Sequence, residues 1–161
     1  MSLDNLLEEF FEQEGWQYTR QGPALITRFE SDQGEWHLMA QPKESQIILF
    51  VSIASLHSKR PRTTALLKFL NLINARMALG CFSLLEEKGN QGIQFVTSLD
   101  ALNEHENLMH KPLLFTLMRR MAYYNLQIFG LYLPHIKAVS EGKPVDETFE
   151  KALEDLKKLA W

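Results

Sequence analysis

The feature that most constrains the fold is a long apolar stretch at residues 113–133, LLFTLMRRMAYYNLQIFGLYL. A helix of this composition is apolar on nearly every side and needs cover from several directions. Arg119 and Arg120 lie inside it, and each arginine would cost about 2.5–3.5 kcal/mol at the centre of a bilayer. We therefore predict a buried helix and not a membrane span. Pro112 is well placed to begin this helix, and Pro134 should kink or break it.

The apolar excess of residues 113–133 has two explanations, and the sequence leaves both open. A C-terminal helix of the same chain is one possible cover for this surface. The other explanation is a subunit or peptide interface, because large exposed apolar patches usually mark contact sites.

Both ends of the chain predict amphipathic helices. Ser2 is a suitable N-cap for the first helix, and Gly15 is placed to end it in a left-handed conformation. Between them, apolar side chains recur on one helical face at Leu3, Leu6, Leu7, Phe10 and Phe11. The second helix is predicted at residues 144–161, with an apolar stripe of Phe149, Leu153, Leu156 and Ala160.

Five segments have the residue pattern of strands, and we predict strands at residues 24–30, 35–41, 46–54, 81–87 and 92–99. Residues 31–34 (SDQG) and 88–92 (KGNQG) have the composition of hairpin turns. The run QIILFVSIA at residues 46–54 is almost continuously apolar. It therefore predicts an inner strand that is covered on both faces.

Further helices are predicted between and after the strands. Pro61 should open a helix that ends at Gly80, and Asp100 is placed to cap another helical stretch. The resulting order, α-β-β-β-α-β-β-α, predicts an α+β fold with an antiparallel five-stranded sheet, packed helices and a C-terminal helix. We expect residues 1–161 to form a single domain, in which residues 144–161 are the C-terminal amphipathic helix.

Charge and cysteine content limit the possible functions. The formal net charge is −3, which argues against a nucleic-acid partner because phosphate binding needs a surplus of cations. The single cysteine cannot form an internal disulfide, which favours a reducing compartment. The first residues carry acids where a secretory signal carries positive charge. We therefore expect a cytoplasmic protein.

No residue pattern predicts catalysis, a metal or a cofactor. Cys81 follows a predicted helix C-terminus, where the helix dipole disfavours a thiolate. We predict that it is a small, partly buried residue at a strand start. His105 and His110 are spaced i, i+5, whereas zinc-binding helices use i, i+4. The other histidines are predicted to be polar surface residues: His37, His57 and His135. We therefore predict a protein that is not an enzyme.

Two surface features remain as candidate contacts with a protein partner or a second copy. The first is the basic cluster at the start of the predicted middle helix, which is either a solvated loop or a docking point for an acidic segment. The second is the apolar helix at residues 113–133. The predicted contact residues are Lys59, Arg60, Arg62, Phe69, Arg119, Tyr123 and Tyr124.

Three segments carry a family resemblance through their order and spacing: FEQEGWQY (residues 11–18), RTTALLKFLNLINARMALGCFSL (62–84) and YLPHIKAVSEGKPVDETFEKAL (132–153). The middle segment contains an asparagine-bearing helix that runs into a glycine and a strand. The last segment contains the spaced residues Tyr132, Pro134, Val139 and Gly142. Together they resemble the YbjN family of bacterial proteins, over nearly the whole chain.

This resemblance implies a fold similar to that of type III secretion chaperones, which are small α+β proteins that commonly dimerise and bind an extended partner segment. It implies no catalytic residues. Our leading hypothesis is a non-catalytic protein-binding module, chaperone-like or regulatory, that acts as a homodimer on a protein partner. One alternative is a small-ligand-binding protein or enzyme with a site assembled only by folding, at which His37, His105 or several acids converge. Another is a structural subunit of a larger complex.

Overall fold

The computed structural model describes residues 2–103 and 107–159, which form one antiparallel sheet and the helices packed on it. The helices are α1 (Leu3–Gln13), α2 (Thr63–Asn74), α3 (Lys111–Ser140) and α4 (Val145–Lys158). The strands are β1 (Thr19–Gln21), β2 (Ala24–Ser31), β3 (Gly34–Pro42), β4 (Ile47–Leu56), β5 (Cys81–Glu87) and β6 (Asn90–Asp100). In space the strands follow the order β1-β2-β3-β4-β6-β5.

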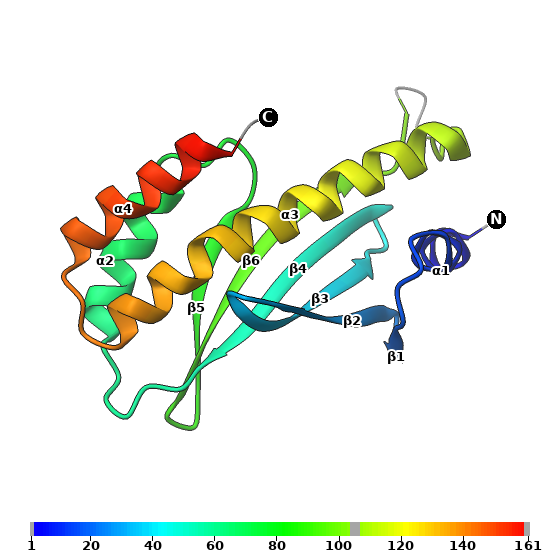
Figure 1. Ribbon diagram of the computed structural model, residues 1–161. Helices are drawn as coiled ribbons and strands as arrows, with labels where there is room; N and C mark the ends of the chain where they lie inside the picture. Colours follow the sequence, from blue (N-terminus) through cyan, green and yellow to red (C-terminus); the bar gives the residue numbers. More distant parts are fainter. Residues whose placement is uncertain (1, 104–106, 160–161) are drawn as a thin grey trace.

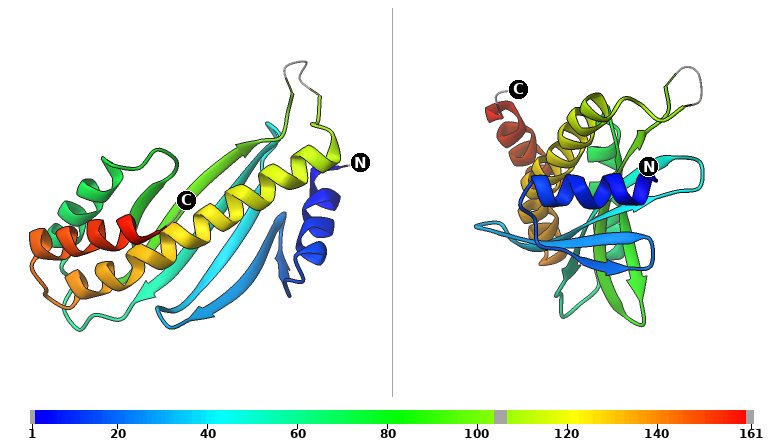
Figure 2. Two further views of the ribbon diagram at one scale, coloured as in Figure 1. Left: turned by 45° about the horizontal axis from the view of Figure 1, so that its top comes forward. Right: turned by 90° about the vertical axis from the view of Figure 1, so that its right-hand side faces the viewer.

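The helices lie on one side of the sheet. α3 runs diagonally across this side (Figures 1 and 2). α1 lies near the first residues of α3, and α2 and α4 lie together near its last residues. The prediction of an α+β fold with an antiparallel sheet is confirmed, although the sheet has six strands and not five. The additional strand, β1, has only three residues, all of them exposed. Its sequence therefore carries no apolar alternation that could have indicated it.

The N-terminal helix forms as predicted. The Ser2 hydroxyl oxygen accepts a hydrogen bond of 3.4 Å from the backbone N–H of Asn5, which caps the first turn. All five predicted core residues of this helix are buried. Gly15 follows the helix with a φ of +70°, a conformation that glycine adopts without steric cost.

The two predicted hairpins, β2–β3 and β5–β6, lie where their turn residues predict them. In the second hairpin, Lys88 and Gly89 have φ values of +50° and +81° between β5 and β6. A two-residue hairpin turn whose twist matches that of the flanking strands requires positive φ at both of its central residues. The prediction that Asp100 caps a helix is wrong. Its carboxylate instead accepts a hydrogen bond of 2.9 Å from the N–H of Leu102, and residues 101–103 and 107–110 contain no helix.

The middle helix is shorter than predicted, since α2 begins at Thr63 and ends at Asn74 instead of Gly80. The reason lies in the Asn74 side chain, which forms two hydrogen bonds of 2.8 Å with the backbone of Phe82. One bond is donated by its amide nitrogen to the carbonyl oxygen, and the other is accepted from the N–H. Asparagine side chains that bond to backbone compete with helix continuation. Gly80 then turns the chain with a φ of +83°.

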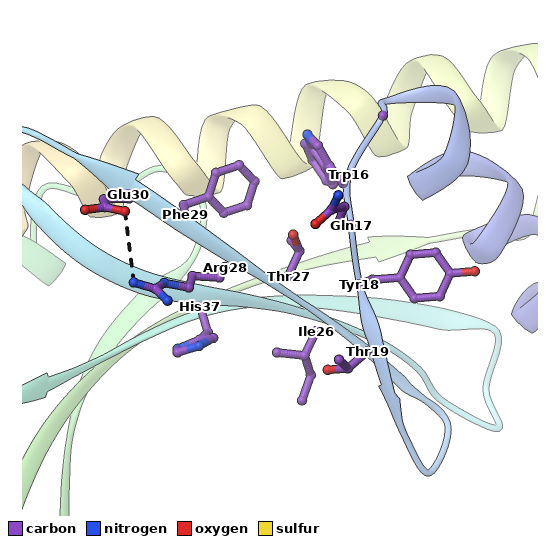
Figure 3. Close-up of a pocket in the computed structure, with 11 residues that line it drawn as sticks. Trp16, Gln17, Tyr18, Thr19, Ile26, Thr27, Arg28, Phe29, Glu30 and His37 are labelled. Carbon is purple, nitrogen blue, oxygen red and sulfur yellow. Dashed lines mark ion pairs between the residues drawn. The ribbon is translucent and has the colours of Figure 1, made fainter.

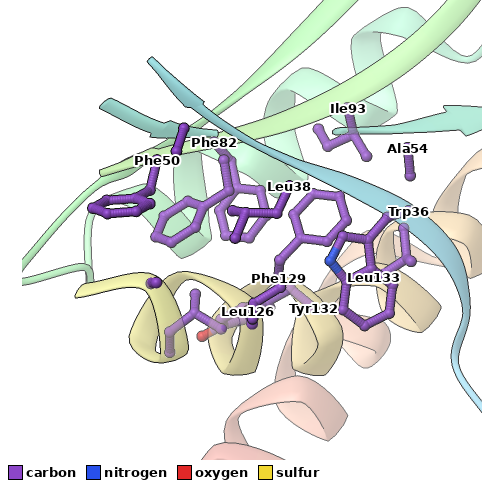
Figure 4. Close-up of a cluster of buried hydrophobic side chains, with 14 of the residues drawn as sticks. Trp36, Leu38, Phe50, Ala54, Phe82, Ile93, Leu126, Phe129, Tyr132 and Leu133 are labelled. Carbon is purple, nitrogen blue, oxygen red and sulfur yellow. The ribbon is translucent and has the colours of Figure 1, made fainter. Parts of the chain in front are cut away.

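The apolar stretch forms the longest described helix, α3, which continues through Pro134 to Ser140. Of the two predicted effects of Pro134, the break is therefore wrong, and the kink stays a prediction. Leu133 and Ile136 are fully buried beside this proline, so tertiary packing holds both parts of the helix together. Among the described residues, no helix has the length and apolarity needed to cross a bilayer. The core between α3 and the sheet is aromatic, and the ring of Phe82 lies against that of Phe129 on α3 (Figure 4). Phe82 also stacks on Phe95 with ring centroids 4.5 Å apart.

The C-terminal helix α4 covers α2 and the last part of α3. The ring of Phe149 packs edge-on against the buried ring of Phe69, with centroids 6.5 Å apart. His135 on α3 lies 3.0 Å from the carboxylate of Asp155 on α4. Of the two explanations for the apolar excess of α3, burial within the chain therefore accounts for its sheet-facing side and its end. Leu113 and Tyr123, nearer its beginning, remain exposed.

Strand β4 departs from the prediction that both of its faces are covered. The face toward the helices is buried, as in Phe50 and Ser52. On the other face Val51 is buried, whereas Leu49 and Ile53 are only half-buried. No described helix lies over that face (Figure 2). The apolar run of β4 therefore contributes to a partly open sheet surface.

Candidate protein-interaction site

The sheet has an incompletely paired edge at β2. Strand β1 pairs only with the first part of β2, and the last pair joins Thr19 to Ile26. On its other side β2 is paired with β3 as far as Ser31. Residues alternate in the direction of their backbone groups along an antiparallel ladder. The N–H and C=O groups of Arg28 and Glu30 therefore face outward, beyond the end of β1, where no described strand pairs with them.

A hollow of about 750 Å³ lies along this open edge, between β2 and the segment that joins α1 to β1. Three aromatic side chains line it, those of Trp16, Tyr18 and Phe29 (Figure 3). Arg28 and His37 also line the hollow. The Arg28 guanidinium is held by the carboxylate of Glu35 at 2.5 Å. The edge therefore combines unpaired backbone groups with an aromatic wall, formed by the side chains of Trp16, Tyr18 and Phe29.

Trp16 forms the centre of this wall. Its backbone N–H donates to the carbonyl oxygen of Phe11 at 3.0 Å, which fixes the chain as it leaves α1. Its ring contacts Phe29 with centroids 5.4 Å apart and Tyr123 at 5.8 Å. The side chain is only half-buried. An aromatic ring that packs against other rings of the protein and remains partly exposed to solvent is a typical anchor for a partner residue.

Two of the predicted contact residues lie next to this wall. Arg119 donates from Nε to the carboxylate of Glu14 at 2.6 Å, and the hydroxyl of Tyr123 donates to the same carboxylate at 3.1 Å. The Glu14 side chain is only 7% exposed. The hydrogen bond to Glu14, together with its negative charge, raises the pKa of Arg119, and burial together with Glu14 raises the pKa of Tyr123. This cluster joins α3 to the end of α1.

The other predicted contact residues lie elsewhere in the fold. Lys59, Arg60 and Arg62 are exposed in the loop between β4 and α2. The Tyr124 hydroxyl donates to the carbonyl oxygen of Leu79 at 3.0 Å. The side chain of Phe69 is fully buried, so it is not on the surface of the folded chain. The predicted residues thus occupy separate places in the fold and do not form one site.

The uncovered sheet face carries a continuous row of side chains across all six strands. The register joins Cys81, Val96, Val51, Met39, Ile26 and Thr19 as successive neighbours. Four members of this row are apolar, and the row passes through the centre of the face. Cys81 begins β5 as predicted, but it is exposed and not partly buried. The reason is that β5 is an edge strand and that the thiol lies at the end of the row.

The edge of β5 differs from that of β2, because its outward-facing backbone is partly occupied. The Asn74 amide bonds to both backbone groups of Phe82. A side chain in this position takes the place of a neighbouring strand. Such covering is a common protection of sheet edges against pairing with other chains.

Among the described residues, no group of three or more His, Cys, Asp or Glu side chains lies close enough together to hold a metal ion. His37, His57 and His110 are exposed, as predicted for polar surface residues. His135 differs, since its side chain is only 13% exposed and bonds to Asp155. Lys158, and less strongly His135, lower the pKa of that carboxyl. His105 lies outside the described residues.

The wall residues Trp16, Tyr18 and Phe29 were not identified from the sequence as site residues. The available signal was the position of two aromatic residues directly after the predicted helix-ending Gly15. Such aromatics also fit a buried loop, however. Only the register of β1 and β2 leaves space beside them.

Comparison with known proteins identifies relatives of this chain. No curated protein matches its sequence. Its fold is similar to the crystal structure of YbjN from E. coli, described as "a putative transcription regulator", with a TM-score of 0.60 and 16% identity over 86% of this chain and 93% of that one. The model of the YbjN family, described as "Putative bacterial sensory transduction regulator", matches residues 4–110. Because this match covers more than half of the chain, the protein belongs to the YbjN family.

Proposed function

We propose that this protein is a non-catalytic regulator that binds an extended segment of a protein partner at the edge of β2. The observation that carries the proposal is the unpaired backbone of Arg28 and Glu30 beside the aromatic-lined hollow. Strand addition to an exposed edge uses backbone hydrogen bonds for affinity and side-chain pockets for specificity. The description of the family as regulators supports the same role.

The register defines how the partner segment would lie. It would continue the line of β1 and run antiparallel to β2, with backbone bonds to Arg28 and Glu30. Side chains alternate between the two faces of a strand. The residue of the partner opposite Phe29 would therefore contact the ring of Trp16, and we expect it to be apolar. Its neighbours would lie beside Arg28 on the other face.

The test starts from purified full-length protein and a displayed library of linear peptides. We expect selected peptides to share apolar residues at alternate positions. Amide hydrogen exchange of Arg28 and Glu30 should slow when such a peptide binds, because these N–H groups become hydrogen-bonded. Selected peptides that protect other amides and leave these two unchanged would contradict the proposal, as would a library that yields no binder.

Two substitutions at one position separate the backbone from the side chain. Glu30→Pro removes an outward N–H and should weaken peptide binding by about tenfold or more, since one backbone bond is lost. Glu30→Gln keeps the N–H and removes only the charge, so binding should stay within about twofold. Equal affinity of the two variants would show that the backbone of β2 is not used.

We also propose that the protein acts as a homodimer and that the second copy covers the apolar row of the open sheet face. The half-buried Met39 and Val96 support this proposal, because a row of this kind gains stability from burial. Light scattering should give the mass of a dimer for the wild type and of a monomer for Met39→Glu. Gln94→Glu, on the same face outside the row, is the control and should remain dimeric. A monomeric wild type at all workable concentrations would remove this part of the proposal.

A further inference from the structure

His57, at the end of β4, is shared by three neighbouring hollows. Their volumes are about 300, 320 and 270 Å³. The first hollow reaches the start of α2 and the end of α3 at Ser140, the second reaches Lys137 on α3, and the third reaches Gln91 on β6. Three elements that are distant in sequence therefore meet around one imidazole.

The cations around these hollows have no ionic partner in the described part of the chain. Lys59, Arg60 and Arg62 line the first hollow and Lys137 the second. None of the four takes part in an ion pair between described residues. One carboxylate, that of Glu141, lines the first hollow among its three cations. The lining of the first hollow thus carries more cations than carboxylates, although the chain carries a formal net charge of −3.

Carboxylates do not cancel the charge of the second hollow either. Glu35 lines it, but this side chain is engaged by the guanidinium of Arg28 at 2.5 Å. The ammonium of Lys137 lies over Gly34, where an added Cβ would come within 2.5 Å of it. The close approach depends on the absence of a side chain at Gly34, and it places this cation beside the hollow.

The basic loop is tied to the end of α3. The hydroxyl of Ser58 lies 3.0 Å from the carbonyl oxygen of Ser140 and 2.8 Å from that of Arg60, and its oxygen accepts from the N–H of Arg60 at 3.3 Å. The Arg62 guanidinium lies against Gly142, where an added Cβ would come within 2.9 Å. These contacts hold the backbone of the loop and the Arg62 guanidinium in place, which lowers the entropy lost when the loop binds an anion.

The sheet contributes a backbone donor to the second hollow. Strands β3 and β4 remain paired as far as His37 and Ile53, whereas β4 and β6 continue to Leu56 and Gln91. The sheet therefore divides at this end, and Ser55 lines the hollow between the two branches. By the alternation of the ladder, the N–H of Ser55 faces this gap without a partner strand.

We propose that the hollows around His57 bind a small soluble molecule that carries more than one phosphate group. Guanidinium and ammonium groups are the side chains that recognise phosphate oxygens most strongly. The cations are divided between two hollows, so a single phosphate cannot reach all of them. The imidazole of His57 lies between the two sets and is a further donor. The cations of this site, Lys59, Arg60, Arg62 and Lys137, do not line the hollow at the β2 edge, although His37 lines both that hollow and the second hollow here.

The test measures the binding of pyrophosphate to the full-length protein by calorimetry at constant ionic strength. We expect saturable binding, at least tenfold tighter than that of inorganic phosphate, and shifts of the amide resonances of Ser55 and Ser58. Sodium chloride at matched ionic strength should produce neither effect. Binding that does not saturate, or pyrophosphate and phosphate affinities that are equal, would overturn the proposal.

Matched arginine variants locate the site. Arg60→Gln should weaken pyrophosphate binding at least tenfold, and Lys59→Gln provides a second variant in the same loop. Arg120→Gln is the control, because Arg120 is also exposed and forms no ion pair between described residues. Its affinity should stay within twofold of the wild type. An equal loss in all three variants would mean that only the overall charge attracts the anion, and the proposal would then be wrong.

Discussion

The side-chain amide of Asn125, in the middle of α3, donates a hydrogen bond of 2.9 Å to the backbone carbonyl oxygen of Phe50 in β4. The same nitrogen lies 3.2 Å from the carbonyl oxygen of Phe95 and 3.1 Å from the hydroxyl oxygen of Thr97. The hydroxyl of Ser52 donates to the amide oxygen at 2.6 Å. Asn125 is fully buried. A polar network thus fixes the position of α3 over the sheet inside an otherwise apolar layer.

The first prediction concerns this network. Asn125→Leu should destabilise the protein by about 2–3 kcal/mol, because the hydroxyl of Ser52 and other buried polar groups lose their partner. Urea denaturation measures the change in the free energy of unfolding. Ser52→Ala removes a single bond of the network and should cost only about 1 kcal/mol. A leucine variant as stable as the wild type would show that the network contributes no net stability.

The second prediction concerns Tyr132, whose hydroxyl is buried with no hydrogen-bond partner in the described structure. Burial is the main cause that raises the pKa of this phenol above its ordinary value of 10.0. Tyr132→Phe should therefore keep or increase stability near neutral pH, because no bond is lost. Tyr124→Phe is the comparison. It loses the bond to Leu79 and should cost about 1 kcal/mol.

The raised pKa of Tyr132 also predicts a dependence on pH. Above about pH 10 the unfolded chain releases the phenol proton while the folded chain retains it, so the stability of the wild type falls as pH rises. Tyr132→Phe removes this contribution. Thermal unfolding at about pH 7 and about pH 10.5 should therefore show a smaller decrease in Tm for the variant. An identical decrease in both proteins would exclude Tyr132 as a cause.

The third prediction concerns the covered edge of β5. Asn74→Ala removes both hydrogen bonds to Phe82 and should reduce stability by about 1–2 kcal/mol. It also exposes an unpaired strand edge, so we expect faster hydrogen exchange at the Phe82 amide and increased light scattering on concentration. Asn71→Ala, an exposed residue one helical turn earlier, is the control. Unchanged exchange at Phe82 would contradict the role given to Asn74.

The fourth prediction concerns the attachment of α4. Phe149→Ala removes the ring that packs on Phe69 and lies under the guanidinium of Arg76. We expect a loss of about 3 kcal/mol, the usual cost of deleting a buried phenylalanine ring. Limited proteolysis should then cut first within α4. Glu150→Ala, an exposed neighbour, should leave the cleavage pattern unchanged, and early cleavage elsewhere in the Phe149 variant would show that α4 is not the weakened element.

Several elements were predictable because their signals are local. The helix of α1 follows from an apolar period of one helical face together with Ser2 and Gly15 at its ends. The hairpin between β5 and β6 follows from Lys88 and Gly89 at its turn. Period and turn chemistry act over a few residues, and so the chain itself carries them. That residues 1–161 form a single domain stays a prediction.

Other boundaries depended on contacts between distant residues. The end of α2 is set by the bonds of Asn74 to Phe82. Pro134 remains inside α3 because the core holds Leu133 and Ile136 on both sides of it. Local propensity favours a later end for α2 and an earlier end for α3. In both cases tertiary packing and hydrogen bonding outweighed it.

The sequence by itself determined the fold class, the first helix, the hairpins and the presence of a basic loop at Lys59, Arg60 and Arg62. The tertiary structure alone decided which surfaces are open. The short pairing of β1 leaves Arg28 and Glu30 unpaired beside Trp16. The packing of α3 beside the divided end of the sheet places Lys137 and the basic loop at neighbouring hollows that share His57. The physical reason is that periodicity is a property of neighbouring residues. An edge or a hollow, by contrast, is defined by where distant segments stop contacting one another.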